Sequence, residues 1–132
     1  MKKLWACALL SALTMCAQPL RVAIAGLEHG HVDGFLNSLK SHPDVKVVGV
    51  YEADTALARE YAKQFGLAQD LFYTDLAAMI EKVKPEAVSI FSSTYDHPVI
   101  VEVCAAHHID AMMEKPLAVD MSGARRIRDA AT

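Results

Sequence analysis

The sequence predicts an α/β fold built on a doubly wound parallel sheet. From Leu20 onward, short apolar runs rich in β-branched residues alternate with longer segments in which apolar residues recur at helical spacing. The short runs are mostly apolar, as expected of strands that helices cover on both faces. Because parallel crossovers are right-handed, the simplest strand order is 3-2-1-4-5, which is a Rossmann-like arrangement.

Five strands are expected, over residues 21–25, 45–51, 71–73, 87–91 and 109–113, the last of which also looks buried. The intervening helices are predicted from apolar residues spaced three and four apart. The expected inner positions are Val32, Phe35, Leu36 and Leu39; Leu57, Tyr61 and Phe65; Leu76, Met79, Ile80 and Val83; and Val99, Ile100, Val103 and Cys104.

Boundary residues support these helices. Asp54 is a suitable N-cap, Gly66 suits a helix end, and either Thr74 or Asp75 can cap the third helix. Pro98 belongs in a first helical turn, and Asp120 starts the last helix.

Composition indicates a globular domain. The chain has 132 residues, of which 53% are hydrophobic and 22% charged, and its net charge is −3. The acidic balance argues against a nucleic-acid surface, and the basic run at 125–128 reads as one solvated helix face.

Residues 1–17 have the layout of a general secretory signal peptide. A basic start, Met1-Lys2-Lys3, precedes an apolar run over 4–15, which is too short to span a bilayer. We expect cleavage after Ala17, export to the periplasm or beyond, and a mature domain over 18–132. A lipoprotein is less favoured, because Met15 replaces the small residue before Cys16.

Once that segment is removed, Cys104 is the single remaining cysteine. It cannot form an internal disulfide, and it lies on the apolar side of a predicted helix. We expect a buried, inert thiol.

The first strand leads into a turn, 25–31, that contains Gly26, Glu28, His29, Gly30 and His31. Glycine here allows a tight turn and a close approach of backbone amides to a pyrophosphate. Only Gly26 matches the dinucleotide fingerprint of three glycines, and Glu28 would repel phosphate if it pointed inward.

Glu52 ends the second strand, 26 residues after Gly26. A carboxylate there can accept hydrogen bonds from an adenosine ribose and would disfavour a 2′-phosphate, so NAD is favoured over NADP. Glu52 would otherwise simply precede a turn.

A metal site is the alternative for the first turn. His29 and His31 could share an ion, as in metal-dependent hydrolases built on barrels, with Glu28, His97 or the pair at 107–108 as further ligands. Those further residues have no recognisable ligand spacing, so the sequence does not predict a metal.

Two more turns lie at strand ends. Residues 92–97 include Ser92, Ser93 and His97, which could line the nicotinamide side of a cofactor crevice or serve in capping and packing. Glu114-Lys115-Pro116 follows the fifth strand, where ligands of open α/β sheets gather, and Pro116 makes the turn stiff.

Together these residues resemble the Gfo/Idh/MocA family, named after glucose–fructose oxidoreductase and inositol dehydrogenase. The resemblance runs from about Leu20 to Thr132, and its most specific part is the ordered set Ala25-Gly26, Glu52, His97 and Glu114-Lys115-Pro116. It implies that this chain is an N-terminal NAD-binding domain and that a second α/β domain follows it. It also implies that the longer enzyme is a homo-oligomer. Glu28, His31 and Ser93 depart from the family pattern.

The resemblance also implies roles. Lys115 would be the catalytic lysine that contacts a sugar or cyclitol hydroxyl, and Glu114 would lie near the nicotinamide ribose. Pro116 would follow a cis peptide. The remaining cofactor-binding residues would be Gly26, Glu28, His29, Gly30, His31, Glu52, Ser92, Ser93 and His97.

We therefore expect hydride transfer between NAD, with NADP as the alternative, and a sugar or cyclitol hydroxyl, with an acid–base partner from the second domain. The chain alone would bind nucleotide but turn over little. Two alternatives stay open: an exported, non-catalytic nucleotide- or sugar-binding module, and, less favoured, the metal-dependent hydrolase.

Overall fold

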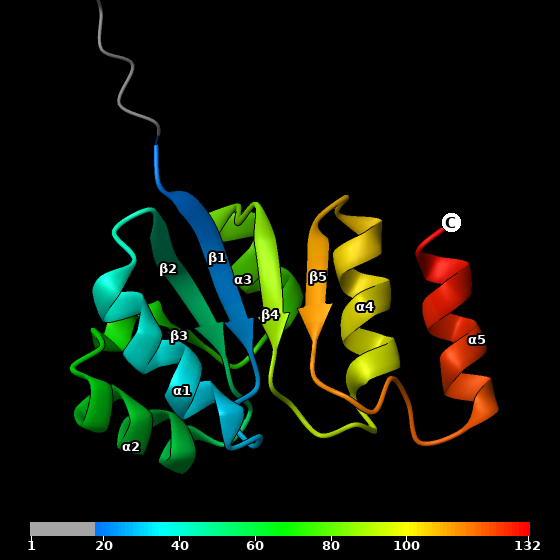
Figure 1. The fold of residues 1–132 in the computed structure, drawn as a ribbon, viewed down its shortest axis with the longest axis horizontal. Coiled ribbons are helices and arrows are strands. Elements are labelled where there is room, and N and C mark those ends of the chain that lie inside the picture. Colours follow the sequence, from blue (N-terminus) through cyan, green and yellow to red (C-terminus); the bar gives the residue numbers. More distant parts are fainter. Residues whose placement is uncertain (1–17) are drawn as a thin grey trace, which may run out of the picture.

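The computed structural model describes residues 18–132, in which strands and helices alternate (Figure 1). The expected signal peptide over 1–17 lies outside this part and stays a prediction. None of the helices described here is long and apolar enough to cross a membrane.

The strands are β1 (Leu20–Ala25), β2 (Val45–Tyr51), β3 (Phe72–Tyr73), β4 (Ala87–Ile90) and β5 (Asp110–Met113). The helices are α1 (His31–Ser38), α2 (Thr55–Phe65), α3 (Leu76–Val83), α4 (His97–Ala106) and α5 (Met121–Ala130), with 3₁₀ turns at Leu39–Ser41 and Gln69–Leu71.

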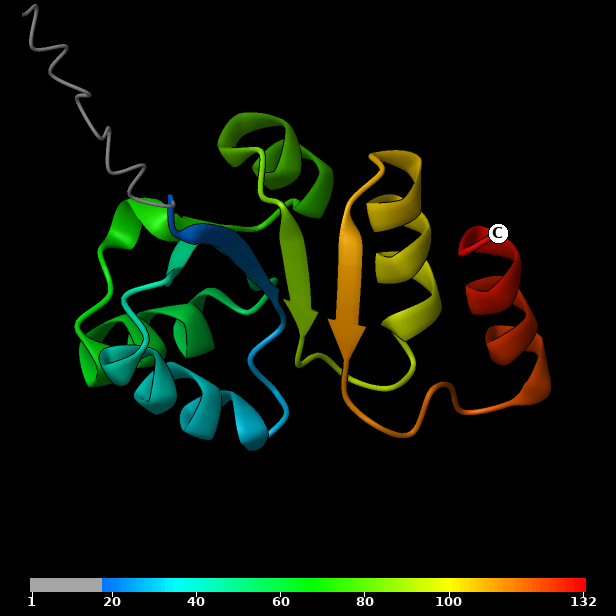
Figure 2. The ribbon, with the colours of Figure 1, turned by 45° about the horizontal axis from the view of Figure 1, so that its top comes forward.

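The five strands form one parallel sheet in the order β3-β2-β1-β4-β5, which confirms the predicted fold class and order. The chain moves outward from β1 to β3 and then returns to the other side of β1 as β4. The switch point of the topology therefore lies between β1 and β4, where ligands of open α/β sheets bind. All the strands point the same way, so their carboxyl ends share one edge (Figures 1 and 2).

Helices cover both faces of the sheet. Alternate residues of a strand point to opposite faces, so Ala23 and Ala25 belong to one core and Ile24 to the other. One core lies under α3 and α4, and α5 adds Ile127 to it; the other lies under α1 and α2. Burial on both sides explains why the central parts of β1, β2 and β4 are mostly apolar. The second core consists of Ile24, Leu27, Val32, Leu36, Val50 and Phe91.

Most predicted helix boundaries are confirmed. The Asp54 carboxylate accepts hydrogen bonds from the N–H groups of Ala56 and Leu57, and Gly66 ends α2 in the left-handed conformation. Asp75, not Thr74, caps α3, since its carboxylate accepts from Ala78 N–H. Asp120 caps α5, and Pro98 lies in the first turn of α4.

Two expectations about burial are wrong. The last strand is not buried: β5 is an edge strand that pairs only with β4, and Met112 is 55% exposed. Val99 was expected on the inner side of α4, but it is 51% exposed. The inner side of α4 includes Ile100, Val101 and Cys104, because the helix is rotated relative to the simple apolar pattern.

The turns after β1 and β4 touch at Gly26. This residue has a φ of +82°, and a Cβ added to it would lie 2.4 Å from the Cα of Ser92. Both the backbone conformation and the close approach require glycine. Gly30 is different: its φ is −57°, and nothing lies within 4 Å of an added Cβ.

We therefore expect Gly26→Ala to lower the free energy of unfolding by about 2 kcal/mol or more, because it combines positive-φ strain with a backbone clash. Urea denaturation measures this. The matched control, Gly30→Ala, should change stability by no more than about 0.5 kcal/mol. Equal effects of the two substitutions would contradict the close approach of these turns.

Cys104 provides a second test of the fold. The side chain is 1% exposed, and burial raises the pKa of its thiol to about 11. Because the thiolate is the reactive form, the peptide that contains Cys104 should resist iodoacetamide at about pH 8 in the folded protein and react in concentrated urea. Mass spectrometry of the digested protein reports this residue separately from Cys7 and Cys16. Comparable labelling with and without urea would show that the helix packs differently.

Candidate functional site

The candidate site lies at the carboxyl edge of the sheet, where the turns after β1, β2, β4 and β5 meet. Residues from all four turns are connected there by hydrogen bonds, as described below. Each predicted site residue belongs to one of these turns, so the structure brings the set together at one edge of the molecule.

Glu52 connects the turns after β1 and β2. Its side chain is buried, and its carboxylate accepts hydrogen bonds from Leu27 N–H and Asp54 N–H, both at 2.9 Å. A carboxylate has about four acceptor positions, so these two bonds leave capacity for a ligand hydroxyl. The sequence predicted a ribose ligand here; the structure adds that the same carboxylate holds the first turn in place.

Glu28 connects the turns after β1 and β4. Its carboxylate accepts a 2.7 Å hydrogen bond from Ser93 N–H, and His29 N–H donates a 2.8 Å bond to the carbonyl of Phe91. The Glu28 side chain is therefore bonded to the turn after β4. From the sequence, Glu28 would repel a phosphate if it pointed inward, whereas its contact in the structure is with a backbone amide. Nothing in the sequence signals this pairing, because the partner is the backbone amide of Ser93.

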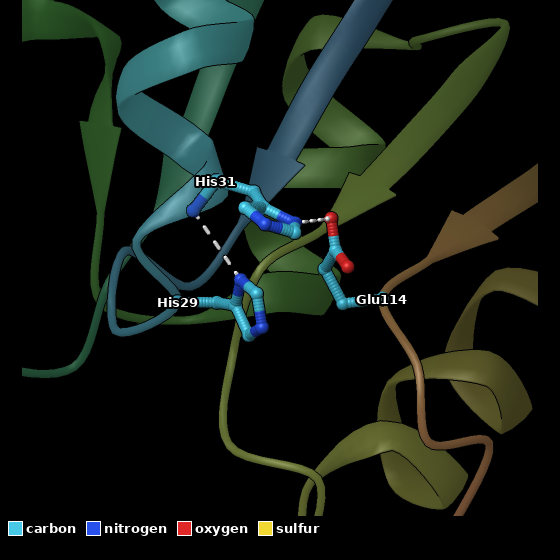
Figure 3. A group of neighbouring side chains, drawn as sticks. All are labelled: His29, His31 and Glu114. Carbon is cyan, nitrogen blue, oxygen red and sulfur yellow. Dashed lines mark hydrogen bonds and ion pairs between the residues drawn. The ribbon is translucent and has the colours of Figure 1, made fainter.

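The histidines of the first turn reach the turn after β5 (Figure 3). The Nδ1 of His31 lies 2.9 Å from Oε1 of Glu114, and His31 N–H donates a 3.3 Å hydrogen bond to Nδ1 of His29. The two rings meet edge to face, with centroids 4.6 Å apart. The hydrogen bond from His31, together with the nearby charges of His31, His29 and Lys115, lowers the pKa of Glu114, so this carboxyl is ionised at neutral pH.

The turn after β5 carries the proposed catalytic group. The peptide between Lys115 and Pro116 is cis, as the resemblance implied. Lys115 is exposed, and no carboxylate within residues 18–132 lies within ion-pair distance of its ammonium group. Its neighbour Glu114 is anchored by its N–H to the carbonyl of Ile90 at 3.3 Å. The amine is therefore free to contact a ligand at the sheet edge.

His97 is buried, which agrees with the packing role that the sequence left open beside a place in the crevice. Its ring is 1% exposed, and Nδ1 lies 3.3 Å from the carbonyl of Leu117. The ring is buried because its helix begins beneath the turn that carries Lys115. His97 can therefore influence a ligand only through that turn, and Nε2 has no hydrogen-bond partner within the described residues.

Ser92 is likewise buried, and its Oγ donates a 3.3 Å hydrogen bond to the carbonyl of Ser93. Its backbone packs on Gly26, as described above. The direct contribution of Ser92 is therefore to fix the turn, whereas Ser93 is partly exposed at the edge.

Acidic groups surround the end of β2. The pKa of Tyr51 is raised by burial and then by the charges of Asp96, Glu52, Asp75 and Glu28. Cationic and imidazole groups at the same edge come from the turns after β1 and β5, as His29, His31 and Lys115.

The open sheet excludes the barrel on which the metal-hydrolase alternative depended, at least within residues 18–132. The fold is shared with solved dehydrogenases at low identity. A myo-inositol 2-dehydrogenase from Lactobacillus plantarum aligns with a TM-score of 0.73 and 24% identity, over 86% of this chain and 33% of that one. An inositol dehydrogenase homologue from Azotobacter vinelandii, solved with NAD+, gives 0.68 and 24%, over 87% and 32%.

Sequence comparison gives a closer relationship. The D-glucoside 3-dehydrogenase of Escherichia coli is 30% identical over 120 residues, which are 89% of this chain and 33% of that enzyme. The chain thus spans about a third of the length of this relative. The model of the Gfo/Idh/MocA oxidoreductase family, described as an NAD-binding Rossmann fold, matches residues 20–132. The chain therefore belongs to the Gfo/Idh/MocA oxidoreductase family, and it contains that family's NAD-binding Rossmann fold.

Proposed function

We propose that this chain binds NAD across the carboxyl edge of its sheet and that, in the whole protein, the bound cofactor exchanges hydride with a sugar or cyclitol hydroxyl. One observation carries the proposal. Glu52 and Lys115 follow β2 and β5, on opposite sides of the switch point between β1 and β4, and both lie at the same edge of the sheet. A dinucleotide that spans the switch point would have its adenosine ribose diol beside Glu52 and its nicotinamide end beside Lys115.

The residues present fit such a cofactor. Gly30 leaves open space at the start of α1, where backbone amides can approach a pyrophosphate. The buried Glu52 carboxylate provides a fixed acceptor for a diol, and its charge disfavours a 2′-phosphate. We infer that NAD is preferred over NADP.

The bound nicotinamide would supply the hydride chemistry. The chain itself would place the Lys115 ammonium beside the substrate hydroxyl, where it stabilises the negative charge that develops on oxygen as the proton leaves. Glu114, held by His31, keeps a second charge fixed next to that lysine. The relationship to a glucoside dehydrogenase supports a sugar-like substrate, and the acid–base partner would come from another part of the whole protein.

Calorimetric titration of the purified chain with NAD and NADP tests this proposal. We expect saturable binding of NAD, weaker binding of NADP, and a loss of at least about tenfold in NAD affinity in Glu52→Gln, because a charge-assisted hydrogen bond is lost. NADP should lose less, since the substitution also removes a repulsive charge.

Glu86→Gln is the matched control. Its carboxylate also accepts a backbone hydrogen bond, from Arg21 N–H at 2.9 Å, but it lies just before β4 at the opposite edge of the sheet. It should leave NAD affinity unchanged, and circular dichroism should show that both variants fold. If neither dinucleotide binds the folded chain, the proposal fails and the non-catalytic module becomes the better description.

A further inference from the structure

We propose that His29, His31 and Glu114 form a binding site for a divalent transition-metal ion of the Zn²⁺ type. One ligand atom from each of these three residues lies within 4.8 Å of the other two (Figure 3). The histidines come from the turn after β1 and the carboxylate from the turn after β5, so the fold adds Glu114 to the histidine pair that the sequence offered as possible ligands. The proposal concerns metal binding alone and does not depend on the proposed function.

The distances suit coordination after small side-chain rotations. Zinc binds imidazole nitrogen and carboxylate oxygen at about 2.0–2.2 Å, which places tetrahedral ligands about 3.4 Å apart. The His31 Nδ1 and Glu114 Oε1 atoms are already 2.9 Å apart. An ion would replace the hydrogen bond between this pair, and His29, whose ligand atom lies within 4.8 Å of the other two, would complete the set by a side-chain rotation.

The donor set selects the class of ion. Two imidazoles and one carboxylate suit zinc, cobalt, nickel or copper, whereas magnesium and calcium prefer sites made only of oxygen. Three protein ligands also leave a fourth position for water, as in open zinc sites.

The backbone holds the ligands in place before any ion arrives. His29 N–H is bonded to the Phe91 carbonyl at 2.8 Å, and Glu114 N–H to the Ile90 carbonyl at 3.3 Å, so both turns are fixed to the end of β4. The His31 side chain is 62% exposed and the Glu114 side chain 18%, which leaves an entry path from solvent. The Lys115 ammonium opposes a cation, and the Glu114 carboxylate, as one of the three ligands, supplies a compensating negative charge.

A plain hydrogen-bonded histidine–glutamate pair is the competing explanation, and the chain contains a control for it. His42 and Asp44 form a similar exposed pair, with Nδ1 and Oδ1 3.6 Å apart and the His42 side chain 59% exposed. Among the described residues, no third metal-ligating side chain lies close enough to this pair to form a cluster. His42→Asn therefore removes an ordinary surface histidine of matched exposure.

Titration calorimetry of the purified chain with Zn²⁺, without any dinucleotide, tests the proposal. We expect one saturable site per chain. Both His31→Asn and Glu114→Gln should lower the affinity for Zn²⁺ by more than about tenfold, because each removes a direct ligand and the loss of a residue that only supports a ligand already costs about tenfold. His42→Asn should bind as the unmodified chain does. Cys7 and Cys16 are common to all these variants, so differences between them report on the cluster.

Cobalt provides an independent readout. Co²⁺ bound at a tetrahedral site should give visible absorption bands that both cluster variants lose, while circular dichroism shows that they remain folded. The proposal is overturned if His31→Asn and Glu114→Gln bind Zn²⁺ as the unmodified chain does, or if the unmodified chain shows no saturable binding. Because no dinucleotide is present, either outcome leaves the NAD proposal unaffected.

Discussion

The contact between Gly26 and Ser92 is the constraint on which the arrangement of the site depends. β1 and β4 are neighbours on either side of the switch point, and their turns approach so closely that a side chain at position 26 has no room. Glu28 and Ser93 extend the same contact by a hydrogen bond between a carboxylate and a backbone amide. The turns after β1 and β4 are therefore joined at the centre of the edge. The turns after β2 and β5 attach to the turn after β1 through Glu52 and Glu114.

Buried and partly buried carboxylates hold the turns of this edge in place. The Glu52 carboxylate accepts hydrogen bonds from Leu27 N–H and Asp54 N–H, and that of Glu114 is hydrogen-bonded to His31 Nδ1. A burial cost accompanies each fixed charge, and the backbone amides and imidazole offset it. The same side chains that fix the turns are thus the ones that we propose a ligand contacts.

The fold was largely predictable because its elements depend on local patterns. Strands such as β2 are rich in valine, and the helix caps at Asp54, Asp75 and Asp120 are local hydrogen bonds. The site residues could be assigned to turns, but their contacts could not, because they join positions far apart in sequence through backbone groups. His97 illustrates this: its position allowed either a place in the crevice or a packing role, and the turn at Leu117 covers its ring. The exposure of β5 was equally hidden, since edge and central strands can have similar sequences.

The central claim, that ligand binding occurs where the parallel strands end, is tested most directly by nuclear magnetic resonance of the ¹⁵N-labelled chain titrated with NAD. The account predicts that the amide signals of Leu27, His31, Ser93 and Glu114 shift together, while those of Lys46 and Glu86, at the amino ends of β2 and β4, stay unchanged. Shifts confined to the amino ends of the strands, or no shifts at saturating NAD, would contradict it.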